Sequence, residues 1–402
     1  MRDHVPPARP RTDASRAEVP DSEVSRAELP PPPLTVLLTG AGGQVGAAVL
    51  RALTAAGCRV VALVHRTEVP GAAHGVRGDI TRPSFGLPPE RYRELARRTD
   101  AVVHCAADTD FRADTRRTME VNVRGTDHVV AFAARAGARL VQLSSAFVVR
   151  SALVRRNAAA YAGAAAAPVS AYLESKTRAE QRVREAGVPS VVVRPSLVIG
   201  DARTGRVERV QGLLACLVAV GAGWLDRLPG TPGTRLDMVP SDYLARVVRA
   251  AVTDVRVRGD LWVTAGPLAP TYAQLMPLLG AFGLGGVELV DPVVCAERLA
   301  YGPAGTAARR LTRQLLAQST VLHGAEDFPP AEVRALGIEP LTAELISTAF
   351  VRTAGRLAEH HVPAGRAARR VPRPPGRATP PPRQETDTSW TSPFSPSSSS
   401  GC

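Results

Sequence analysis

The stretch "PLTVLLTGAGGQVGAAVLRALTAAGCRVVALVHR" (residues 33–66) decides the fold class of this chain. An apolar run at 34–39 leads into a glycine-rich turn, a segment of helical character that continues to about residue 56, and a second apolar run at 59–64. A strand, a turn, a helix and a second strand in this order open a βαβ unit. The stretch therefore predicts an α/β fold of the Rossmann type, with a doubly wound parallel sheet.

The turn carries a glycine pattern that suits a dinucleotide. Gly40, Gly43 and Gly46 are spaced G-x-x-G-x-x-G, with Gly42 as an extra glycine, whereas the strict G-x-G-x-x-G pattern is interrupted by Val45. Residues without side chains allow a tight turn and let a pyrophosphate approach the positive end of the helix. A glycine-rich turn without a ligand is the alternative, but the order of strand, turn and helix favours the dinucleotide.

The residues after the second strand indicate which dinucleotide binds. NAD-specific enzymes usually place a carboxylate there for the ribose hydroxyls, but here Val64 is followed by His65 and Arg66. Because a basic pair attracts a 2′-phosphate, NADP(H) is favoured over NAD(H) as the cofactor. The alternative is that these two side chains are ordinary solvated surface.

The alternation of strands and helices continues along the chain. Apolar runs at 101–107, 139–145 and 189–195 alternate with helical segments around 117–136 and 170–187. Such runs are typical of parallel strands buried on both faces, and ligands bind at the carboxyl ends of these strands. The residues at or just after predicted strand ends are Asp79, Ala106, Ala107, Ser144, Ser145 and Pro195.

Composition divides the chain into four parts. Residues 1–33 are polar and end in a proline run, and residues 361–402 are rich in Arg, Pro and Ser, so both ends are predicted to be disordered. Residues 34–201 are predicted to form an NAD(P)-binding Rossmann domain. Residues 202–360 are predicted to form a smaller, mainly helical substrate lobe, with elements that return to the Rossmann sheet at about 237–267.

Charge, hydropathy and cysteine usage argue against several classes of protein. The formal net charge is +13, but the arginines are scattered and not interleaved with aromatic residues, so nucleic acid is not the expected partner. The longest apolar run, 212–225, is too short to span a bilayer, and no signal-peptide core is present. Five cysteines without paired spacing and eight scattered histidines predict a reduced, cytoplasmic protein without a metal site. The oligomeric state is not readable from the sequence.

A single lysine marks the candidate catalytic helix. Of the 50 lysine and arginine residues only Lys176 is a lysine, and Tyr172 lies four residues before it. With Ser170 as its predicted cap, this segment reads as a helix on which both side chains share one face. A nearby ammonium lowers the pKa of a phenol, so Lys176 is predicted to tune Tyr172. The alternative is that one lysine happens to stand here by chance.

Motifs along most of the chain resemble one superfamily of oxidoreductases. The motifs, in chain order, are "TGAGGQVG", "GDI", "HCAADTDF", "NVRGT", "QLSSAFV", "AYLESK" and "VRPSLVIG". Together they resemble the extended short-chain dehydrogenase/reductase superfamily over about residues 34–355. The later "LPGTPGTRLDMVPSDYLARVV" and "FPPAEVRALGIEPLTAELI" are more similar to its male-sterility, fatty acyl reductase and thioester reductase branch than to its sugar-nucleotide epimerases.

The resemblance implies roles for individual residues. Tyr172 and Lys176 match the catalytic tyrosine and lysine, Ser145 matches the catalytic serine better than its neighbour Ser144, and Asn122 matches the asparagine of "NVxGT". In that reading Lys176 also binds the nicotinamide ribose, and Asp79 lies beside the adenine. Asp242 directly precedes an apolar-periodic run and is therefore expected to cap a helix rather than to act as a catalytic group. The positions expected to bind the cofactor are Gly40, Gly43, Gly46, Gln44, Val45, His65, Arg66, Asp79, Ile80, Ala106, Ala107, Lys176 and Pro195.

The resemblance implies NADPH-dependent reduction of an acyl thioester, bound to coenzyme A or to a carrier protein, to an aldehyde or an alcohol. Ser145 would hold the substrate oxygen as it gains negative charge, and Tyr172 would supply the proton. The apolar run at 209–225 is a candidate wall of the acyl pocket. Two alternatives remain open: a sugar-nucleotide epimerase, dehydratase or hydroxysteroid-type dehydrogenase with the same residues, and a non-catalytic NADP-sensing protein.

Overall fold

The structure is a computed structural model that describes most of the predicted folded region. It describes residues 33–65, 69–109, 114–161, 167–222, 224–225, 227–280, 282, 287–301 and 307–361. All of these belong to one unit, Pro33–Cys402. Apart from their innermost positions, the two ends predicted to be disordered lie outside the described residues, and so does Arg66.

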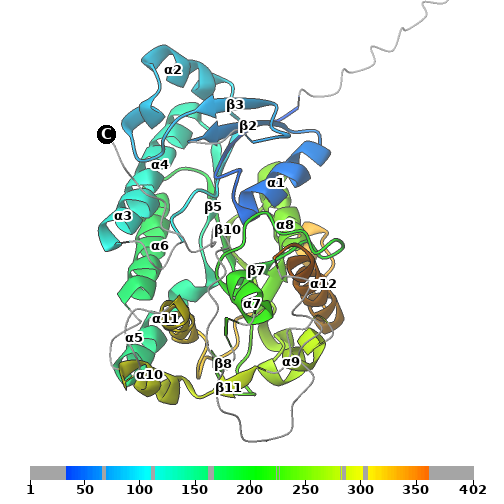
Figure 1. Ribbon diagram of the computed structural model, residues 1–402. Coiled ribbons are helices and arrows are strands. Elements are labelled where there is room, and N and C mark those ends of the chain that lie inside the picture. The colour runs from blue at the N-terminus through cyan, green and yellow to red at the C-terminus, as the bar shows by residue number, and fades with distance from the viewer. Residues whose placement is uncertain are drawn as a thin grey trace, which may run out of the picture. The chain divides into compact units, whose positions relative to one another are not determined.

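Seven parallel strands form the central sheet within the described part of the chain (Figure 1). In their order across the sheet they are β10 (Gly259–Val263), β6 (Ser190–Pro195), β5 (Arg139–Leu143), β4 (Ala101–His104), β1 (Thr35–Thr39), β2 (Arg59–Val64) and β3 (His74–Arg77). Every neighbouring pair is parallel, and the direction of winding reverses between β1 and β4. This is the doubly wound topology that the sequence predicts, and ligands bind at such a reversal point.

Alternate side chains of the strands enter two separate apolar clusters, one on each face of the sheet. In β1, Val36 and Leu38 belong to one cluster and Leu37 to the other, as strand geometry requires. The first face is covered by α1 (Gln44–Ala55) and α8 (Ser241–Thr253), and the second by α2 (Pro89–Arg97), α3 (Thr115–Met119), α4 (Gly125–Ala136) and α6 (Ala167–Glu185) (Figure 1). A π-helical turn, η2 (Glu120–Arg124), joins α3 to α4.

The second half of the chain builds smaller elements at one end of the sheet. Its strands pair as β7 (Leu197–Ile199) with β9 (Met238–Pro240) and β8 (Arg227–Pro229) with β11 (Glu288–Val290). Its helices are α7 (Leu213–Gly221), α9 (Tyr272–Gly280), α10 (Pro292–Tyr301), α11 (Ala307–Ser319) and α12 (Ala343–His361), and α5 (Ser151–Ala160) lies beside them. Short 3₁₀ turns are η1 (Pro83–Gly86), η3 (Ala146–Arg150), η4 (Gly266–Leu268) and η5 (Arg334–Leu336).

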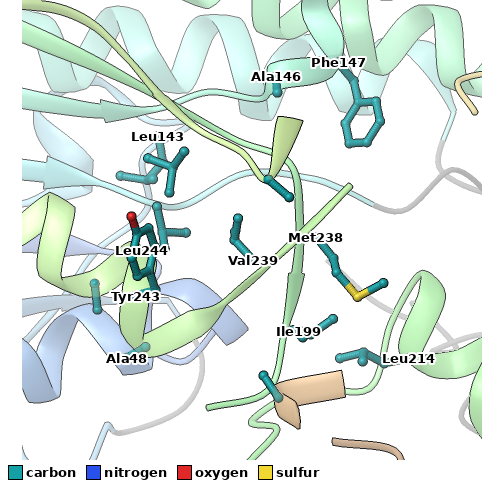
Figure 2. Close-up of a cluster of buried hydrophobic side chains, with 14 of the residues drawn as sticks. Ala48, Leu143, Ala146, Phe147, Ile199, Leu214, Met238, Val239, Tyr243 and Leu244 are labelled. Carbon is teal, nitrogen blue, oxygen red and sulfur yellow. The ribbon is translucent and has the colours of Figure 1, made fainter. Parts of the chain in front are cut away.

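The two halves share one apolar core. Figure 2 shows Ala48 of α1 and Leu143 of β5 in the same cluster as Leu214 of α7, Met238 of β9 and Tyr243 of α8. Strand β10 likewise extends the central sheet next to β6. The segment that follows residue 201 therefore packs directly onto the carboxyl ends of the central strands, where the candidate site lies.

Two of the predicted helix caps are wrong. Ser170 lies inside α6, which begins at Ala167. Asp242 lies in the first turn of α8, whose cap position is Pro240, and its carboxylate accepts a hydrogen bond from the Ala202 N–H at 2.7 Å. The Asp242 carboxylate thus anchors the loop after β7 instead of capping its own helix. No helix in the described ranges has both the length and the apolar character needed to cross a membrane.

Candidate functional site

A cavity of about 1740 Å³ runs along the carboxyl ends of the central strands. One end is formed by the glycine turn after β1, the middle by the ends of β4 and β5, and the far end by α7, α9 and α11. Pockets for drug-sized ligands are usually about 300–1,000 Å³. This cavity is therefore large enough for a dinucleotide and a second molecule in one continuous space.

Two glycines let the turn after β1 pack against its surroundings. Gly40 has a φ of +71°, and a Cβ there would lie 2.5 Å from the Ala106 nitrogen. A Cβ on Gly46 would lie only 2.1 Å from the Gly40 carbonyl oxygen. Gly46 is not among the residues that line the cavity; the structure shows its close packing against the turn, and its contact with the cofactor stays a prediction.

The other two glycines leave space open above the start of α1. Gly43 is the cap residue of α1 and provides no side chain to bind the first N–H groups of the helix. A Cβ on Gly42 would meet only the Val69 side chain, at 3.9 Å, and both glycines line the cavity. Uncapped N–H groups at a helix start bind phosphate, so this turn fits the pyrophosphate of a dinucleotide.

Gln44 ties the turn to a distant loop. Its Nε2 donates to the Ile199 carbonyl at 3.2 Å, and its Oε1 accepts from the Glu208 N–H at 2.7 Å and the Arg209 N–H at 3.2 Å. Arg51 of α1 adds an ion pair with Glu208 at 2.5 Å. Arg206 and Glu208 of this loop line the cavity beside α1 and were not among the predicted site residues.

His65 and Asp79 face each other at the edge of the cavity where β2 and β3 end. The His65 Nε2 lies 3.6 Å from the Asp79 carboxylate, which also accepts hydrogen bonds from the N–H and the hydroxyl of Thr81 at 2.9 and 2.8 Å. Burial raises the pKa of Asp79, but these hydrogen bonds and the nearby His65 and Arg82 outweigh it and lower the pKa. Ile80 lines the cavity too and packs against Gly125.

A buried hydrogen-bond chain holds the loop after β4. The Ala106 N–H donates to the Thr39 hydroxyl at 3.1 Å, the Thr39 hydroxyl lies 2.7 Å from His104 Nδ1, and His104 Nε2 lies 3.2 Å from the Thr126 hydroxyl. Burial and the charge of Lys176 lower the pKa of His104 to about 3, so this ring is neutral. Because Thr126 gives its proton to the Asn122 carbonyl, at 2.7 Å, His104 donates from Nε2 and accepts at Nδ1. The chain fixes Ala106, which lines the cavity with Ala107 and Pro195.

The candidate catalytic side chains Ser145, Tyr172 and Lys176 come together in the middle of the cavity. The Tyr172 hydroxyl is hydrogen-bonded to the Ser145 side chain. Lys176 donates from Nζ to the Leu143 carbonyl at 2.9 Å. The Ser144 hydroxyl points elsewhere, because it donates to Glu180 at 2.5 Å. The Ser144 hydroxyl is thus engaged by Glu180, and the choice of Ser145 as the catalytic serine stays a prediction.

Burial controls the protonation of the tyrosine and the lysine. It raises the pKa of Tyr172 to about 12, although the hydrogen bond with Ser145 acts in the opposite direction. It also lowers the pKa of Lys176 to about 8, although the charges of Cys105 and Glu180 act in the opposite direction. Without a bound cofactor, the pKa of Tyr172 is therefore raised and not lowered, contrary to the expectation for a phenol near Lys176. Tyr172 is a protonated phenol at neutral pH.

Asn122 supports the site without lining the cavity. Its Oδ1 accepts from the Asp108 N–H at 2.7 Å, and its Nδ2 donates to the Asp108 carbonyl and to the Ser175 hydroxyl, both at 2.9 Å. Ser175 in turn donates to the Tyr172 carbonyl at 2.7 Å. The π-helical turn η2 places Asn122 between the loop after β4 and α6, and such turns often mark functional sites.

The far end of the cavity is mostly apolar. Leu213, Leu217 and Val220 of α7 line it, so the predicted wall at 209–225 does face the cavity while most of α7 is also core. Further apolar lining residues are Leu228, Pro229, Leu236, Leu275, Met276, Leu279, Leu315, Leu322 and Phe350. Polar side chains also line this surface, among them those of Tyr272, Gln314, Gln318 and Ser319.

Gln318 lines the cavity with a buried hydrogen-bond donor that has no acceptor among the described residues. Its Nε2 is buried without a hydrogen-bond acceptor among the described residues, and its Oε1 meets only the Cys216 thiol at 3.8 Å. A buried donor without an acceptor is unfavourable unless something else supplies one. No set of three or more His, Cys, Asp or Glu side chains in the described ranges is placed to hold a metal ion.

The chain matches a family model described as male sterility protein over residues 68–248. It is 32% identical over 225 residues to a hybrid PKS-NRPS synthetase of Talaromyces variabilis, which is 52% of this chain and 5% of that protein. It is also 30% identical over 194 residues to the L-2-aminoadipate reductase large subunit of Eremothecium gossypii, which is 44% of this chain and 14% of that protein. The chain thus spans only a small part of these curated relatives.

A solved structure has the same fold. The terminal R domain from the myxalamid PKS-NRPS biosynthetic pathway is 21% identical, with a TM-score of 0.64 over 82% of this chain and 92% of that one. At this level of identity the likeness concerns the fold alone.

Proposed function

Because the chain belongs to the extended short-chain dehydrogenase/reductase superfamily, we propose that it reduces an acyl thioester with NADPH. The observation that carries the proposal is the place of Ser145, Tyr172 and Lys176 in the cavity. They lie between a groove that fits a dinucleotide and an apolar end that fits an acyl group. A reduction site needs both partners to meet at a proton donor, and this arrangement brings them together.

The chain's own residues can manage the oxygen of the thioester. When bound, NADPH supplies the hydride, so that the thioester, NADPH and a proton yield an aldehyde, a thiol and NADP⁺. Ser145 and Tyr172 can donate hydrogen bonds to the carbonyl oxygen as it gains negative charge. With its pKa raised to about 12, the Tyr172 phenol holds a proton at neutral pH and can release it to this oxygen.

The preference for NADPH rests on the residues at the end of β2. The first residue after this strand is His65, not a carboxylate, and its side chain is 58% exposed beside the cavity. Asp79 stands near it, but this carboxylate already accepts two hydrogen bonds from Thr81. A 2′-phosphate at this strand end would meet the exposed His65 imidazole, whose Nε2 lies 3.6 Å from Asp79. Comparison of the Kd values of NADPH and NADH tests this preference.

The apolar end of the cavity favours an acyl group over a sugar nucleotide. A sugar carries many hydroxyl groups, and the surface between α7, α9 and α11 offers them few partners. The names of the relatives, which include peptide synthetases and an aminoadipate reductase, support an acyl substrate on a carrier or on coenzyme A. The buried Nε2 of Gln318 further favours an acyl group that carries a hydrogen-bond acceptor along its chain.

The test is the consumption of NADPH by purified protein with a panel of acyl-CoA and acyl-pantetheine thioesters. We expect turnover with at least one thioester and release of a free thiol. In a Tyr172→Phe variant we expect unchanged NADPH affinity and a loss of kcat of about 10²–10⁴-fold, the usual contribution of a general acid. Tyr92→Phe is the matched control, because Tyr92 of α2 is buried in the apolar cluster on the other face of the sheet and does not line the cavity. Wild-type protein that reduces no thioester, or a Tyr172→Phe variant with normal turnover, would refute the proposal.

A further inference from the structure

Three consecutive residues at the end of β5 contact one face of α6. The Leu143 carbonyl accepts from Lys176, the Ser144 hydroxyl donates to Glu180, and the Ser145 side chain is hydrogen-bonded to Tyr172. Residues 172, 176 and 180 are spaced by four, so their side chains lie along one stripe of the helix. The middle contact of the three involves no residue that the proposed reaction uses.

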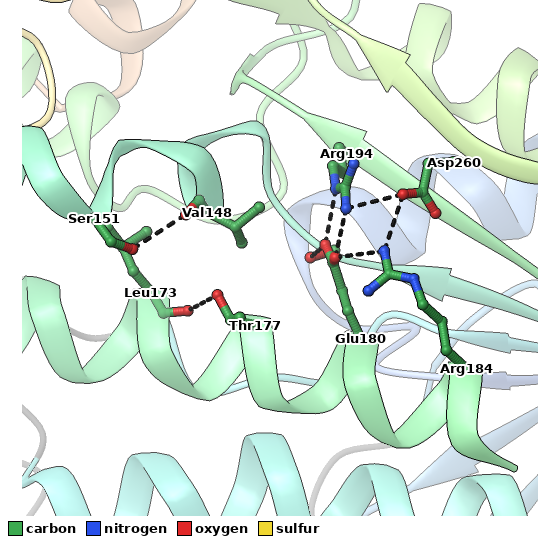
Figure 3. A network of polar contacts seen from close by, with 9 residues as sticks. Val148, Ser151, Leu173, Thr177, Glu180, Arg184, Arg194 and Asp260 are labelled. Carbon is green, nitrogen blue, oxygen red and sulfur yellow. Dashed lines mark hydrogen bonds and ion pairs between the residues drawn. The ribbon is translucent and has the colours of Figure 1, made fainter.

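Glu180 is the centre of a buried polar network. Its carboxylate accepts from Arg194 Nε at 2.9 Å and Nη2 at 2.6 Å, and from Arg184 Nη2 at 3.0 Å (Figure 3). Asp260 of β10 accepts from both arginines at 2.9 Å. The network thereby links α6 to β6 and β10, and through Ser144 to β5.

The Glu180 side chain is only 3% exposed, yet it remains a carboxylate. Burial raises its pKa, but the hydrogen bonds from Arg194 and Ser144 outweigh burial and lower the pKa. Buried ion pairs add little stability compared with apolar residues of the same shape, because the desolvation of both charges offsets their attraction. Orientation is what a well-bonded buried carboxylate can contribute here.

Ser144, the residue before Ser145, is anchored through both its backbone and its side chain. Its N–H donates to the Val193 carbonyl at 2.8 Å, which continues the ladder between β5 and β6 by one step beyond Leu143. Within the described part of the chain, the Ser145 hydroxyl accepts from the N–H of Phe147, at 3.3 Å, besides its contact with Tyr172. The direction in which Ser145 points is therefore set by how Ser144 is anchored.

We propose that Ser144 and Glu180 form a positioning pair, which sets Ser145 against Tyr172 and Lys176 for the reaction. Both residues act through their neighbours, because the Ser144 hydroxyl is already bonded to Glu180. Turnover as a readout rests on the proposed function, whereas a second readout, the pKa of Lys176, does not depend on it. Since Lys176 is the only lysine of the chain, protein isotopically labelled at the lysine Cε gives one lysine signal, whose shift with pH reports the pKa of Lys176 directly.

The charge of Glu180 also reaches Lys176. The titratable groups that face Lys176 are Cys105 and His104 from β4 and its following loop, and Tyr172 and Glu180 from α6. Glu180 raises the pKa of Lys176, against the effect of burial. Removal of its charge should thus move the titration of Lys176 to lower pH, whereas loss of the Ser144 hydroxyl should leave the titration unchanged.

The experiment compares Ser144→Ala, Ser144→Thr and Glu180→Gln with two controls. Ser151→Ala removes a nearby hydroxyl that donates to the Val148 carbonyl at 3.1 Å and not to a residue of α6 (Figure 3). Glu185→Gln removes an exposed carboxylate from the same helix. We expect Ser144→Ala to lower kcat about tenfold or more with unchanged KM for NADPH, Ser144→Thr to restore most of it, and both controls to match the wild type.

For Glu180→Gln we expect a lower kcat together with a lower Lys176 pKa. Wild-type kcat in Ser144→Ala would overturn the proposal, because the network would then be structural only. If the wild type reduces no thioester, the proposed function fails, and the lysine titration still tests whether Glu180 acts on Lys176 as the positioning pair requires. An unchanged Lys176 pKa in Glu180→Gln would then overturn the proposal.

Discussion

A pair of glycine substitutions separates the packing of the turn after β1 from its contact with a cofactor. In Gly46→Ala the new methyl group would lie 2.1 Å from the Gly40 carbonyl oxygen, whereas ordinary contact begins at 3.4 Å. The start of α1 must therefore move away from the turn by about 1.3 Å, the difference between these two distances. Overpacking of this kind costs about 1–3 kcal/mol of the free energy of unfolding.

The same movement should weaken cofactor binding. A shift of more than 1 Å takes a hydrogen bond from a helix N–H to a phosphate beyond about 3.6 Å, where it no longer counts as one. Each such bond to a charged group contributes about 1.5–3 kcal/mol, so the Kd for NADPH should rise about ten- to a hundredfold. With about 2.1 cal/mol/K of unfolding entropy per residue over roughly 330 residues, the Tm of the ligand-free protein should fall by about 1.5–4 °C.

Gly42→Ala is the matched control for the steric effect. Its methyl group would meet only the Val69 side chain, at 3.9 Å, so the ligand-free protein should keep its Tm. The methyl group would nevertheless enter the space above α1, and the Kd for NADPH should rise at least tenfold. Thermal unfolding without ligand and calorimetric titration with NADPH measure both effects. A Gly42→Ala variant that binds NADPH normally would show that the pyrophosphate does not lie over this turn.

Three further predictions concern the reacting end of the site. Lys176→Arg should keep the fold and the charge but lose most activity, because the lysine side chain is only 5% exposed and the bulkier guanidinium must displace its surroundings; near-normal kcat would contradict this. The kcat should be constant at lower pH and fall as the pH rises through about 8, where Lys176 loses its proton, and a limb near its ordinary value of 10.5 would speak against this assignment. Gln318→Met should lower kcat/KM about tenfold for a thioester with an internal carbonyl while sparing its all-alkyl analogue; equal effects on both would exclude Gln318 from acyl recognition.

Much of the fold was predictable because its signals are local. The glycine turn lies between β1 and α1, and Tyr172 and Lys176 lie one helical turn apart on α6. Apolar strands alternating with helices identify a parallel sheet without knowledge of any distant contact. The helix caps predicted at Ser170 and Asp242 are wrong because capping depends on backbone geometry, which a polar residue alone does not reveal.

The protonation of the site was not predictable from residue types. Lys176 and Tyr172 are neighbours in the sequence, and simple electrostatics predicts a lowered phenol pKa. In the folded protein, burial instead raises the pKa of Tyr172 to about 12 and lowers that of Lys176 to about 8. Burial is a property of everything that packs around a side chain, and a short motif does not contain that information.

What the sequence determined by itself is the chemistry that is available: a turn for a pyrophosphate, a phenol and an ammonium on one helix face, and a serine at a strand end. Only the tertiary structure decided how these groups are held. Ser144 bonds to Glu180 across 36 residues, and Gln44 reaches the Glu208 N–H across 164. Cys216 meets Gln318 across 102 residues at the apolar end of the cavity. Such contacts depend on which distant segments pack together, because a hydrogen bond is formed by proximity in space and leaves no periodic trace along the chain.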